Sequence, residues 1–282
     1  GGYERLLADS AVDAVYIPLP NSEHRPWAVR AAEAGKHVLC EKPLGLDEQE
    51  CREMAEAASA HGVALMEAFM YRFHPRTERL VELVREGAVG DVLAIRSAFR
   101  FRLDNPDDIR LRPDLGGGAL MDVGCYCVDV SRRLVGAEPV EVQAFAHWTD
   151  GGVDDRLTGT LHFESGVIAR FDCAMTMEER QFVEVSGTEG HLAAPRAFRP
   201  RGADPVLVHR GDGGRETRDL HPRTDQYRLM VEHFAGCILE GRPVRYPPAA
   251  AGLGMRVIEA LYRSAREGGR VEPVIRSRSR RL

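Results

Sequence analysis

Three residues of types that can move protons stand out, and they lie in two distant stretches of the sequence. Lys42 follows the short run 37–40, whereas Asp122 and Tyr126 follow three consecutive glycines at 116–118. When a hydride leaves an alcohol carbon, the hydroxyl proton must leave as well, so one group must accept it while donors hold the forming carbonyl oxygen. A lysine and a tyrosine can share that task. These residue types therefore favour the oxidation of an alcohol or the reverse reaction.

The stretch around Lys42 predicts a buried strand, His37–Cys40, followed by a stiff turn. Pro43 fixes its own φ and biases Lys42 toward extended geometry, so the ammonium projects from an ordered turn. Open parallel sheets bind their ligands at the carboxyl ends of strands, which is where this lysine lies. The alternative is a solvated lysine in a turn, the usual state of lysines.

The segment 119–135 predicts a helix with an apolar stripe and a polar stripe. The apolar stripe consists of Leu120, Val123, Cys127, Val130 and Leu134. The polar stripe, about 110° round the helix, carries Asp122, Tyr126, Asp129 and Arg133. We expect Asp129 and Arg133, at i and i+4, to form an ion pair on the helix surface. Ordinary packing could also explain Asp122 and Tyr126, but the preceding glycines let a ligand approach the helix start closely.

The first part of the chain alternates between strand and helix patterns. The expected elements are the end of a helix at Glu4–Leu7, a strand at Val12–Ile17, a helix at Pro26–Ala34, the strand at His37–Cys40, a helix from Asp47 to His61 and a strand at Val63–Phe69. Such alternation is typical of βαβ units and a parallel sheet. We therefore expect residues 1–67 to form the C-terminal part of a Rossmann-like, dinucleotide-binding domain.

After Phe69 the pattern changes to that of an α+β domain, residues 68–282. The expected helices are Pro75–Glu86, Ala119–Val135, Gln226–Leu239 and Ala249–Glu267, and the expected strands are Val92–Phe101, Val140–Trp148, Leu157–Phe163, Val167–Ala174 and Phe182–Ser186. We predict a large, open, mainly antiparallel sheet with one face free. Apolar positions such as Val142, Phe163 and Phe171 on that free face predict a homo-oligomer built through the sheet.

Composition excludes several other classes of protein. The chain has 282 residues and a net charge of −5, which gives no electrostatic case for binding nucleic acid or an anionic membrane. No apolar run approaches the roughly 20 residues that span a bilayer, so we expect a cytoplasmic protein. The six cysteines show no Cys-x-x-Cys spacing, and we expect reduced core thiols and no metal site.

The sequence resembles the Gfo/Idh/MocA family of NAD(P)-dependent sugar oxidoreductases in three segments that occur in order. These segments are AVYIPLPNSEHRPWAVRAAEAGKHVLCEKPLG, MEAFMYRFHP and GGGALMDVGCYCVDVSRRLVG. Within the family it is most similar to members resembling xylose dehydrogenase, dihydrodiol dehydrogenase and nucleotide-sugar ketoreductases. The resemblance implies hydride transfer between NAD or NADP and a secondary hydroxyl or ketone of a sugar, a nucleotide sugar or a cyclic diol.

The resemblance also implies roles for single residues. Lys42 matches the catalytic lysine, Tyr126 the acid/base position and Asp122 the aspartate that commonly joins them. A cationic nicotinamide ring beside Lys42 would push the ammonium toward its neutral form. The positions that match the cofactor-binding segments are Leu19, Pro20, Asn21, His24, Glu41, Lys42, Pro43 and, near the domain junction, Arg72.

The sequence departs from the family pattern at its start. The family begins with a strand, a Gly-rich phosphate loop and a second strand, and no G-x-G-x-x-G or P-loop pattern occurs in this sequence. The resemblance implies that about 60 residues of that pattern are missing upstream. We expect the 282 residues alone to bind NAD or NADP weakly or not at all.

Two other functions stay open at this point. One is a degenerate family member that senses a sugar or a dinucleotide and binds a protein partner. The other is a hydrolytic member that oxidises its sugar transiently with bound nicotinamide and releases it by elimination. The joint presence of Lys42, Asp122 and Tyr126 argues against decay of the site.

Overall fold

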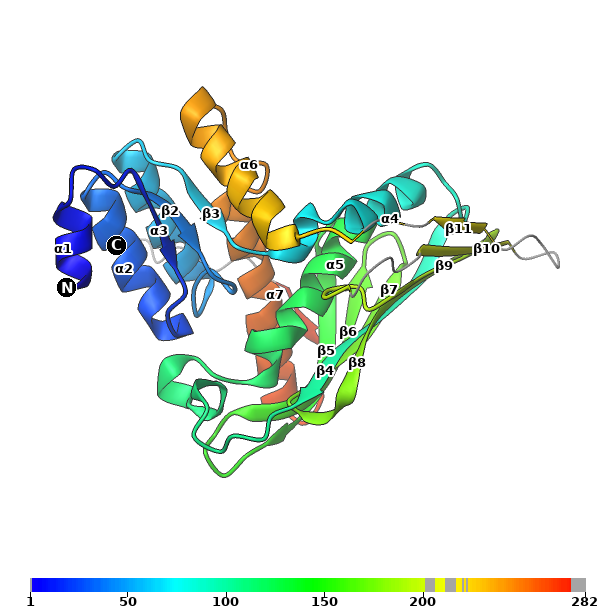
Figure 1. Cartoon of the computed structure of the whole chain (residues 1–282). Coiled ribbons are helices and arrows are strands. Elements are labelled where there is room, and N and C mark those ends of the chain that lie inside the picture. The colour runs from blue at the N-terminus through cyan, green and yellow to red at the C-terminus, as the bar shows by residue number, and fades with distance from the viewer. Residues whose placement is uncertain (1, 201–205, 211–216, 220, 222, 275–282) are drawn as a thin grey trace.

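The computed structural model describes residues 2–200, 206–210, 217–219, 221 and 223–274, which form two sheets with helices between them (Figure 1). The first sheet is parallel, with the strand order β1-β2-β3. Its strands and helices are α1 (Tyr3–Ala8), β1 (Ala14–Ile17), α2 (Asn21–Glu33), β2 (His37–Cys40), α3 (Glu48–Ala60) and β3 (Leu65–Glu67). The alternation confirms the predicted Rossmann-like parallel sheet.

Helix α2 begins at Asn21 and not, as the sequence predicted, at Pro26. Pro26 lies in the second turn, where it removes only the hydrogen bond that its N–H would donate to Ser22, so the helix continues through it. The early start brings the Asn21 amide within hydrogen-bond reach of the Gly116 carbonyl, at 2.8 Å. Helix α2 is thereby tied to the glycine-rich loop.

The second sheet has nine strands within the described part of the chain, in the order β11-β10-β9-β8-β4-β7-β6-β5-β12. Its strands are β4 (Val92–Arg102), β5 (Pro139–Trp148), β6 (Asp154–Phe163), β7 (Ile168–Ala174), β8 (Thr176–Gly187), β9 (Gly190–Pro195), β10 (Val206–Arg210), β11 (Thr217–Asp219) and β12 (Glu272–Pro273). All neighbours are antiparallel except β4 and β7. This confirms the predicted mainly antiparallel sheet, although β9 to β12 were not predicted.

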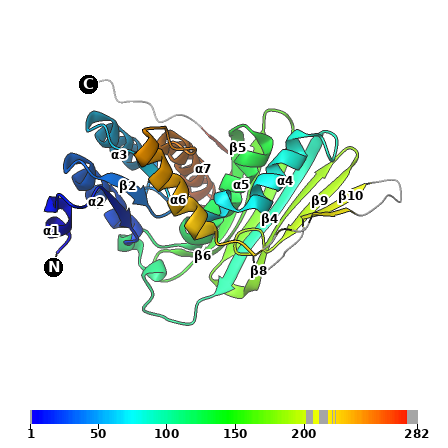
Figure 2. The same cartoon turned by 45° about the horizontal axis from the view of Figure 1, so that its top comes forward.

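The helices of the second part lie on the side of the large sheet that faces the small parallel sheet, and α5 and α7 lie between the two sheets (Figures 1 and 2). They are α4 (Pro75–Arg85), α5 (Cys125–Val135), α6 (Gln226–Glu240) and α7 (Pro248–Arg266), with short turns η1 (Met70–Phe73), η2 (Ile109–Leu111), η3 (Pro113–Leu115) and the π-helical η4 (Leu120–Gly124). Among the described residues, none of the helices has both the length and the apolar composition of a bilayer span.

The apolar side chains that we placed on the free face of the sheet lie on its covered face instead. Val142, Phe163 and Phe171 are 1%, 0% and 2% exposed and belong to the core. Phe171 packs beside Gly159 and close to Leu261 of α7. The prediction failed because strand alternation gives two faces without saying which of them the helices will cover.

The free face carries charged pairs between neighbouring strands. Arg96 lies 3.7 Å from Glu184, and Arg100 lies 3.1 Å from Asp172. Such pairs suit a solvated surface or a polar interface, and each contributes little to stability when exposed. The homo-oligomer therefore stays a prediction without the apolar argument that first supported it.

The helix predicted over 119–135 is confirmed, as η4 continued by α5, and its apolar stripe is buried. Gly118, just before it, has φ +122°, and a Cβ there would lie 2.2 Å from Asp154 Oδ1. The other oxygen of Asp154 accepts the Leu120 N–H at 2.8 Å. A carboxylate of β6 therefore holds the start of the helix, and only a glycine leaves room for it.

We predict that Gly118→Ala lowers the free energy of unfolding by about 3 kcal/mol, from backbone strain together with the clash against Asp154. Gly152→Ala is the matched control, because Gly152 also has positive φ (+88°) but nothing lies within 4 Å of its Cβ position. That variant should lose about 1 kcal/mol. Urea denaturation measures both, and equal losses would contradict the role given to Asp154.

Candidate active site

The Lys42 ammonium reaches from the end of β2 to the start of the helix that carries Asp122. Its Nζ donates a hydrogen bond to the Asp122 main-chain carbonyl at 2.5 Å and to the Asp122 carboxylate at 3.0 Å. The Lys42 side chain is 13% exposed, so the alternative of a solvated lysine is wrong. Asp122 lies in the π-helical turn η4, a type of turn that is frequent at functional sites.

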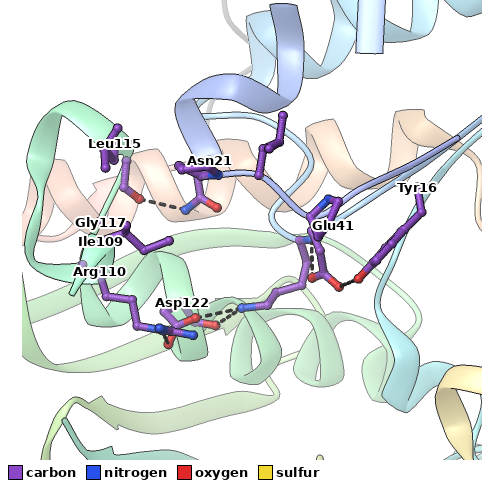
Figure 3. Close-up of a pocket in the computed structure, with 14 residues that line it drawn as sticks. Tyr16, Asn21, Glu41, Ile109, Arg110, Leu115, Gly117 and Asp122 are labelled. Carbon is purple, nitrogen blue, oxygen red and sulfur yellow. Dashed lines mark hydrogen bonds and ion pairs between the residues drawn. The ribbon is translucent and has the colours of Figure 1, made fainter. Parts of the chain in front are cut away.

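Asp122 is held between two cations. Arg110, from η2, donates its Nε–H to Asp122 Oδ2 at 2.9 Å, on the side away from Lys42 (Figure 3). Burial alone would raise the pKa of Asp122, but Lys42 and Arg110 hold it below the usual value. Burial would likewise lower the pKa of Lys42, and Asp122 raises it above the usual value instead. The resting site therefore holds a carboxylate and an ammonium at neutral pH.

Tyr126 lies one turn further along the helix, 4% exposed. Its ring packs against Phe69, Phe99 and Phe198 with centroid distances of 5.0, 5.1 and 5.4 Å. The Lys42 Nζ lies 5.2 Å from the centre of the Tyr126 ring, and the phenol donates to the Met70 sulfur at 3.3 Å. Burial raises the pKa of Tyr126 well above its usual value, so the phenol keeps its proton.

A cleft of about 270 Å³ opens beside Lys42 at the carboxyl ends of β1 and β2 (Figure 3). Of the residues that the family resemblance assigned to the cofactor, five line it. They are Leu19, Pro20, Asn21, Glu41 and Lys42. The opposite wall consists of Ile109, Arg110 and the loop Leu115–Gly118, with Asp122 at the inner end. The structure therefore brings together segments from both parts of the chain.

His24, Pro43 and Arg72 do not line this cleft. His24 is fully buried behind it, with Nδ1 2.9 Å from the Pro43 carbonyl and Nε2 2.9 Å from the Leu19 carbonyl. A neutral imidazole has one N–H and can donate to only one of these carbonyls. Burial lowers the pKa of His24, whereas the two carbonyls oppose that shift. His24 therefore joins the segment that contains Leu19 to the turn that contains Pro43.

Glu41 lies across the cleft from the glycine loop, and both oxygens of its carboxylate accept a hydrogen bond. Tyr16, at the end of β1, donates its phenol proton to Glu41 Oε1 at 2.5 Å, and the Lys42 N–H donates to Oε2 at 3.1 Å (Figure 3). Sequence reasoning missed Tyr16 because a tyrosine in a strand is an ordinary packing residue. It missed Arg110 because no motif in that polar loop marks it.

Arg72 and Asp129 are placed differently from the sequence expectation. Asp129 is 5% exposed and pairs with Arg72, whose Nη2 and Nε lie 2.6 and 3.0 Å from its two oxygens. The predicted surface ion pair between Asp129 and Arg133 is therefore wrong. Arg133 donates to the Tyr246 phenol at 3.2 Å. The i,i+4 rule failed because this face of the helix packs against η1 instead of facing water.

A second cavity, of about 390 Å³, lies on the other side of Lys42. Its floor is aromatic and apolar, and polar side chains of β8, of the loop after β9 and of α6 form its far wall. The floor residues are Met70, Phe99, Phe101, Val123 and Tyr126, and the far wall consists of Glu179, Gln181, Arg199 and Tyr227. Apolar contacts with a few polar groups are the usual composition of small-molecule sites.

The two cavities share one wall, formed by Glu41, Lys42, Arg110 and Asp122. The first cavity lies at the carboxyl ends of the strands, where open α/β sheets bind dinucleotides. Its wall includes Gly116–Gly118, which have no side chains and let a flat ring approach the backbone. Asn21 and Glu41 supply polar groups on the strand side. The residues present therefore fit the nicotinamide end of a dinucleotide, and the second cavity fits a small polar substrate.

Comparison with known families gives two matches. Residues 2–69 match the oxidoreductase family with the NAD-binding Rossmann fold, and residues 77–193 match the GFO/IDH/MocA C-terminal domain. A D-xylose 1-dehydrogenase (NADP(+)) of Haloferax volcanii is 44% identical over 277 residues, which cover 96% of this chain and 84% of that protein.

Two solved structures are similar over almost the whole chain. An aldose-aldose oxidoreductase from Caulobacter crescentus, complexed with glycerol, has a TM-score of 0.89 and 35% identity over 96% of this chain and 82% of that one. A 3-ketoreductase from Actinomadura kijaniata, complexed with NADP and TDP-benzene, has a TM-score of 0.88 and 31% identity over 93% and 81%. The family resemblance is thereby confirmed, and the chain belongs to the Gfo/Idh/MocA family of nicotinamide-dependent, hydride-transferring oxidoreductases.

Proposed function

We propose that this chain transfers a hydride between NAD or NADP and a secondary hydroxyl, or the corresponding ketone, of a sugar. The observation that carries the proposal is the wall shared by the two cavities, with Lys42 at its centre. Reactants bound on the two sides would meet there, which is the main requirement of a two-substrate reaction. The similarity to an aldose oxidoreductase and a xylose dehydrogenase supports a sugar over a cyclic diol.

The proposal assigns each side of the site to a part of the chain. Residues 1–67 would supply the dinucleotide side, where Leu19, Pro20, Asn21 and Glu41 would hold the nicotinamide end. Residues 68–282 would supply the substrate side.

The six cysteines are free and buried, as predicted, which suits a reducing compartment. We therefore keep a cytoplasmic location, with self-association through the charged free face of the large sheet, as part of the proposal.

Bound nicotinamide would exchange the hydride, and this chain would handle the proton. In the direction of ketone reduction, the Tyr126 phenol would give its proton to the forming alkoxide while the Lys42 ammonium stabilises the negative charge. In alcohol oxidation the same groups would have to lose a proton before they can accept one. Asp122 would keep Lys42 charged and aimed at the shared wall, since it holds the Nζ by two hydrogen bonds.

The direct test is formation of reduced nicotinamide when NAD or NADP and a panel of aldoses that includes D-xylose are mixed with this chain and, separately, with a version extended upstream from its own gene. Because we expect the 282 residues alone to bind the cofactor weakly or not at all, we expect turnover of at least one free aldose by the extended version. Turnover of a cyclic diol or a nucleotide sugar alone would overturn the substrate class, and cleavage of a glycoside without net reduction of the cofactor would overturn the reaction type.

We predict that Lys42→Met lowers kcat by at least about 100-fold, because charge stabilisation and proton handling at the shared wall are lost together. Lys36→Met is the matched control. Lys36 is the other lysine of the sequence, and its Nζ donates to the Asp9 carbonyl at 2.8 Å, away from both cavities. It should retain kcat within about twofold, and steady-state kinetics that show equal losses in both variants would contradict the role of Lys42.

The reaction should depend on pH with opposite signs in the two directions. Burial raises the pKa of Tyr126, and Asp122 raises that of Lys42 against the effect of burial, so both groups carry protons at neutral pH. Reduction should therefore be fast at neutral pH and decline as pH rises. Oxidation should accelerate by up to about tenfold per pH unit through the alkaline range. An oxidation rate that does not change between about pH 7 and 10 would rule this assignment out.

A further inference from the structure

A buried charged group lies behind the site and is not used by the proposed chemistry. It consists of Glu67, Arg72 and Asp129, whose side chains are 4–6% exposed. Arg72 Nη2 donates to Glu67 Oε2 at 3.1 Å and to Asp129 Oδ1 at 2.6 Å, and its Nε–H donates to Asp129 Oδ2 at 3.0 Å. The guanidinium therefore joins two carboxylates from different elements.

One end of this group is attached to the turn that carries Lys42. Glu67 is the last residue of β3, and its Oε1 accepts the Leu44 N–H at 3.1 Å. Leu44 follows Pro43, so the hydrogen bond fixes the chain two residues after Lys42. A small cavity of about 20 Å³ beside the group is lined by both Pro43 and Arg72, which shows how closely they lie.

The other end is attached to the helix that carries the remaining site residues. Asp129 lies on α5, three residues beyond Tyr126 and seven beyond Asp122. These spacings correspond to about one and two helical turns, so Asp129 continues the same side of the helix. The Tyr71 phenol also donates to the Asp129 carboxylate. Through Arg72, the position of this helix is fixed relative to the end of β3, where Glu67 holds the Lys42 turn.

The arrangement is stiff. The Arg72 guanidinium lies 4.5 Å from the centre of the Phe69 ring and 5.1 Å from that of Tyr246. A bidentate contact between an arginine and a carboxylate fixes both the distance and the angle between the two groups. Apolar residues would stabilise the fold at this buried position at least as well as an ion pair. The charged residues are therefore better explained by the fixed geometry that they impose than by a gain in stability.

We propose that Glu67, Arg72 and Asp129 are positioning residues that set the distance between the Lys42 turn and the helix bearing Asp122 and Tyr126. Arg72 lines neither of the two cavities that meet at Lys42. This gives it a role other than the direct cofactor contact that the sequence suggested. The roles of Lys42 and Tyr126 in turnover rest on the proposed function, but the geometric claim can be tested without turnover.

The test uses the reactivity of lysine. The sequence contains two lysines, Lys36 and Lys42. The neutral lysine amine attacks the ester carbonyl of N-acetoxysuccinimide and releases N-hydroxysuccinimide and a proton. The acetylation rate of Lys42 therefore reports how firmly Asp122 holds the ammonium, and Lys36 is the internal reference. Mass spectrometry of the digested protein gives both rates. The variants are Arg72→Gln, Glu67→Gln and the control Arg256→Gln, which breaks the ion pair of Arg256 with Glu48 between α7 and α3.

We expect Arg72→Gln to raise the acetylation rate of Lys42 relative to Lys36 by about tenfold, the change that one unit of pKa produces in the neutral fraction. Glu67→Gln keeps the pair of Arg72 with Asp129 and should give a smaller increase of about threefold. It is also the informative variant if Arg72→Gln does not fold. Arg256→Gln should leave the ratio unchanged.

An unchanged ratio in Glu67→Gln and Arg72→Gln would overturn the proposal, as would an equal increase at both lysines. In steady-state kinetics, the same variants should lower kcat about tenfold with little change in either KM. A raised KM for the cofactor at constant kcat would instead make Arg72 a cofactor ligand. Absence of turnover in the unmodified protein would contradict the proposed function and leave the labelling result standing.

Discussion

The ammonium group of Lys42 joins the two parts of this chain at one point. It lies at the end of a strand in the parallel sheet and donates to both the carbonyl and the carboxylate of Asp122, 80 residues further along the chain. The two cavities meet where these residues meet. A site of this kind exists only while the strand end and the helix start keep their separation, so the rest of the structure can be understood as support for that contact.

Support comes from several independent directions. Asp154 of the large sheet holds the N-terminal end of the helix, His24 ties together the two loops of the cleft floor, and Asn21 ties α2 to the glycine loop. The buried Arg72 links the strand side to the helix side. His24, Arg72 and Asp154 are buried, and buried polar groups are costly to leave without hydrogen bonds, so these three contacts specify one geometry.

The sequence was informative where the signal is local. Strand and helix alternation predicted the parallel sheet, and the helix start at Asp47 and the position of Lys42 after β2 followed from local sequence. Which face of a strand or helix is buried depends on partners far along the chain, and there the expectations failed. Val142 was assigned to the wrong face of its sheet, and Asp129 was taken for a surface residue because Arg72, its actual partner, lies 57 residues away. Arg110 could not be found because no local pattern marks it.

The most direct test of this account is a crystal structure of the protein with NADP and the sugar that it turns over fastest. The account predicts that the nicotinamide lies in the cleft beside Asn21 and that the reacting sugar carbon lies within about 3.5 Å of the ring. The sugar hydroxyl should contact both Lys42 Nζ and the Tyr126 phenol. A sugar bound away from the shared wall, or one whose reacting hydroxyl faces neither group, would contradict it.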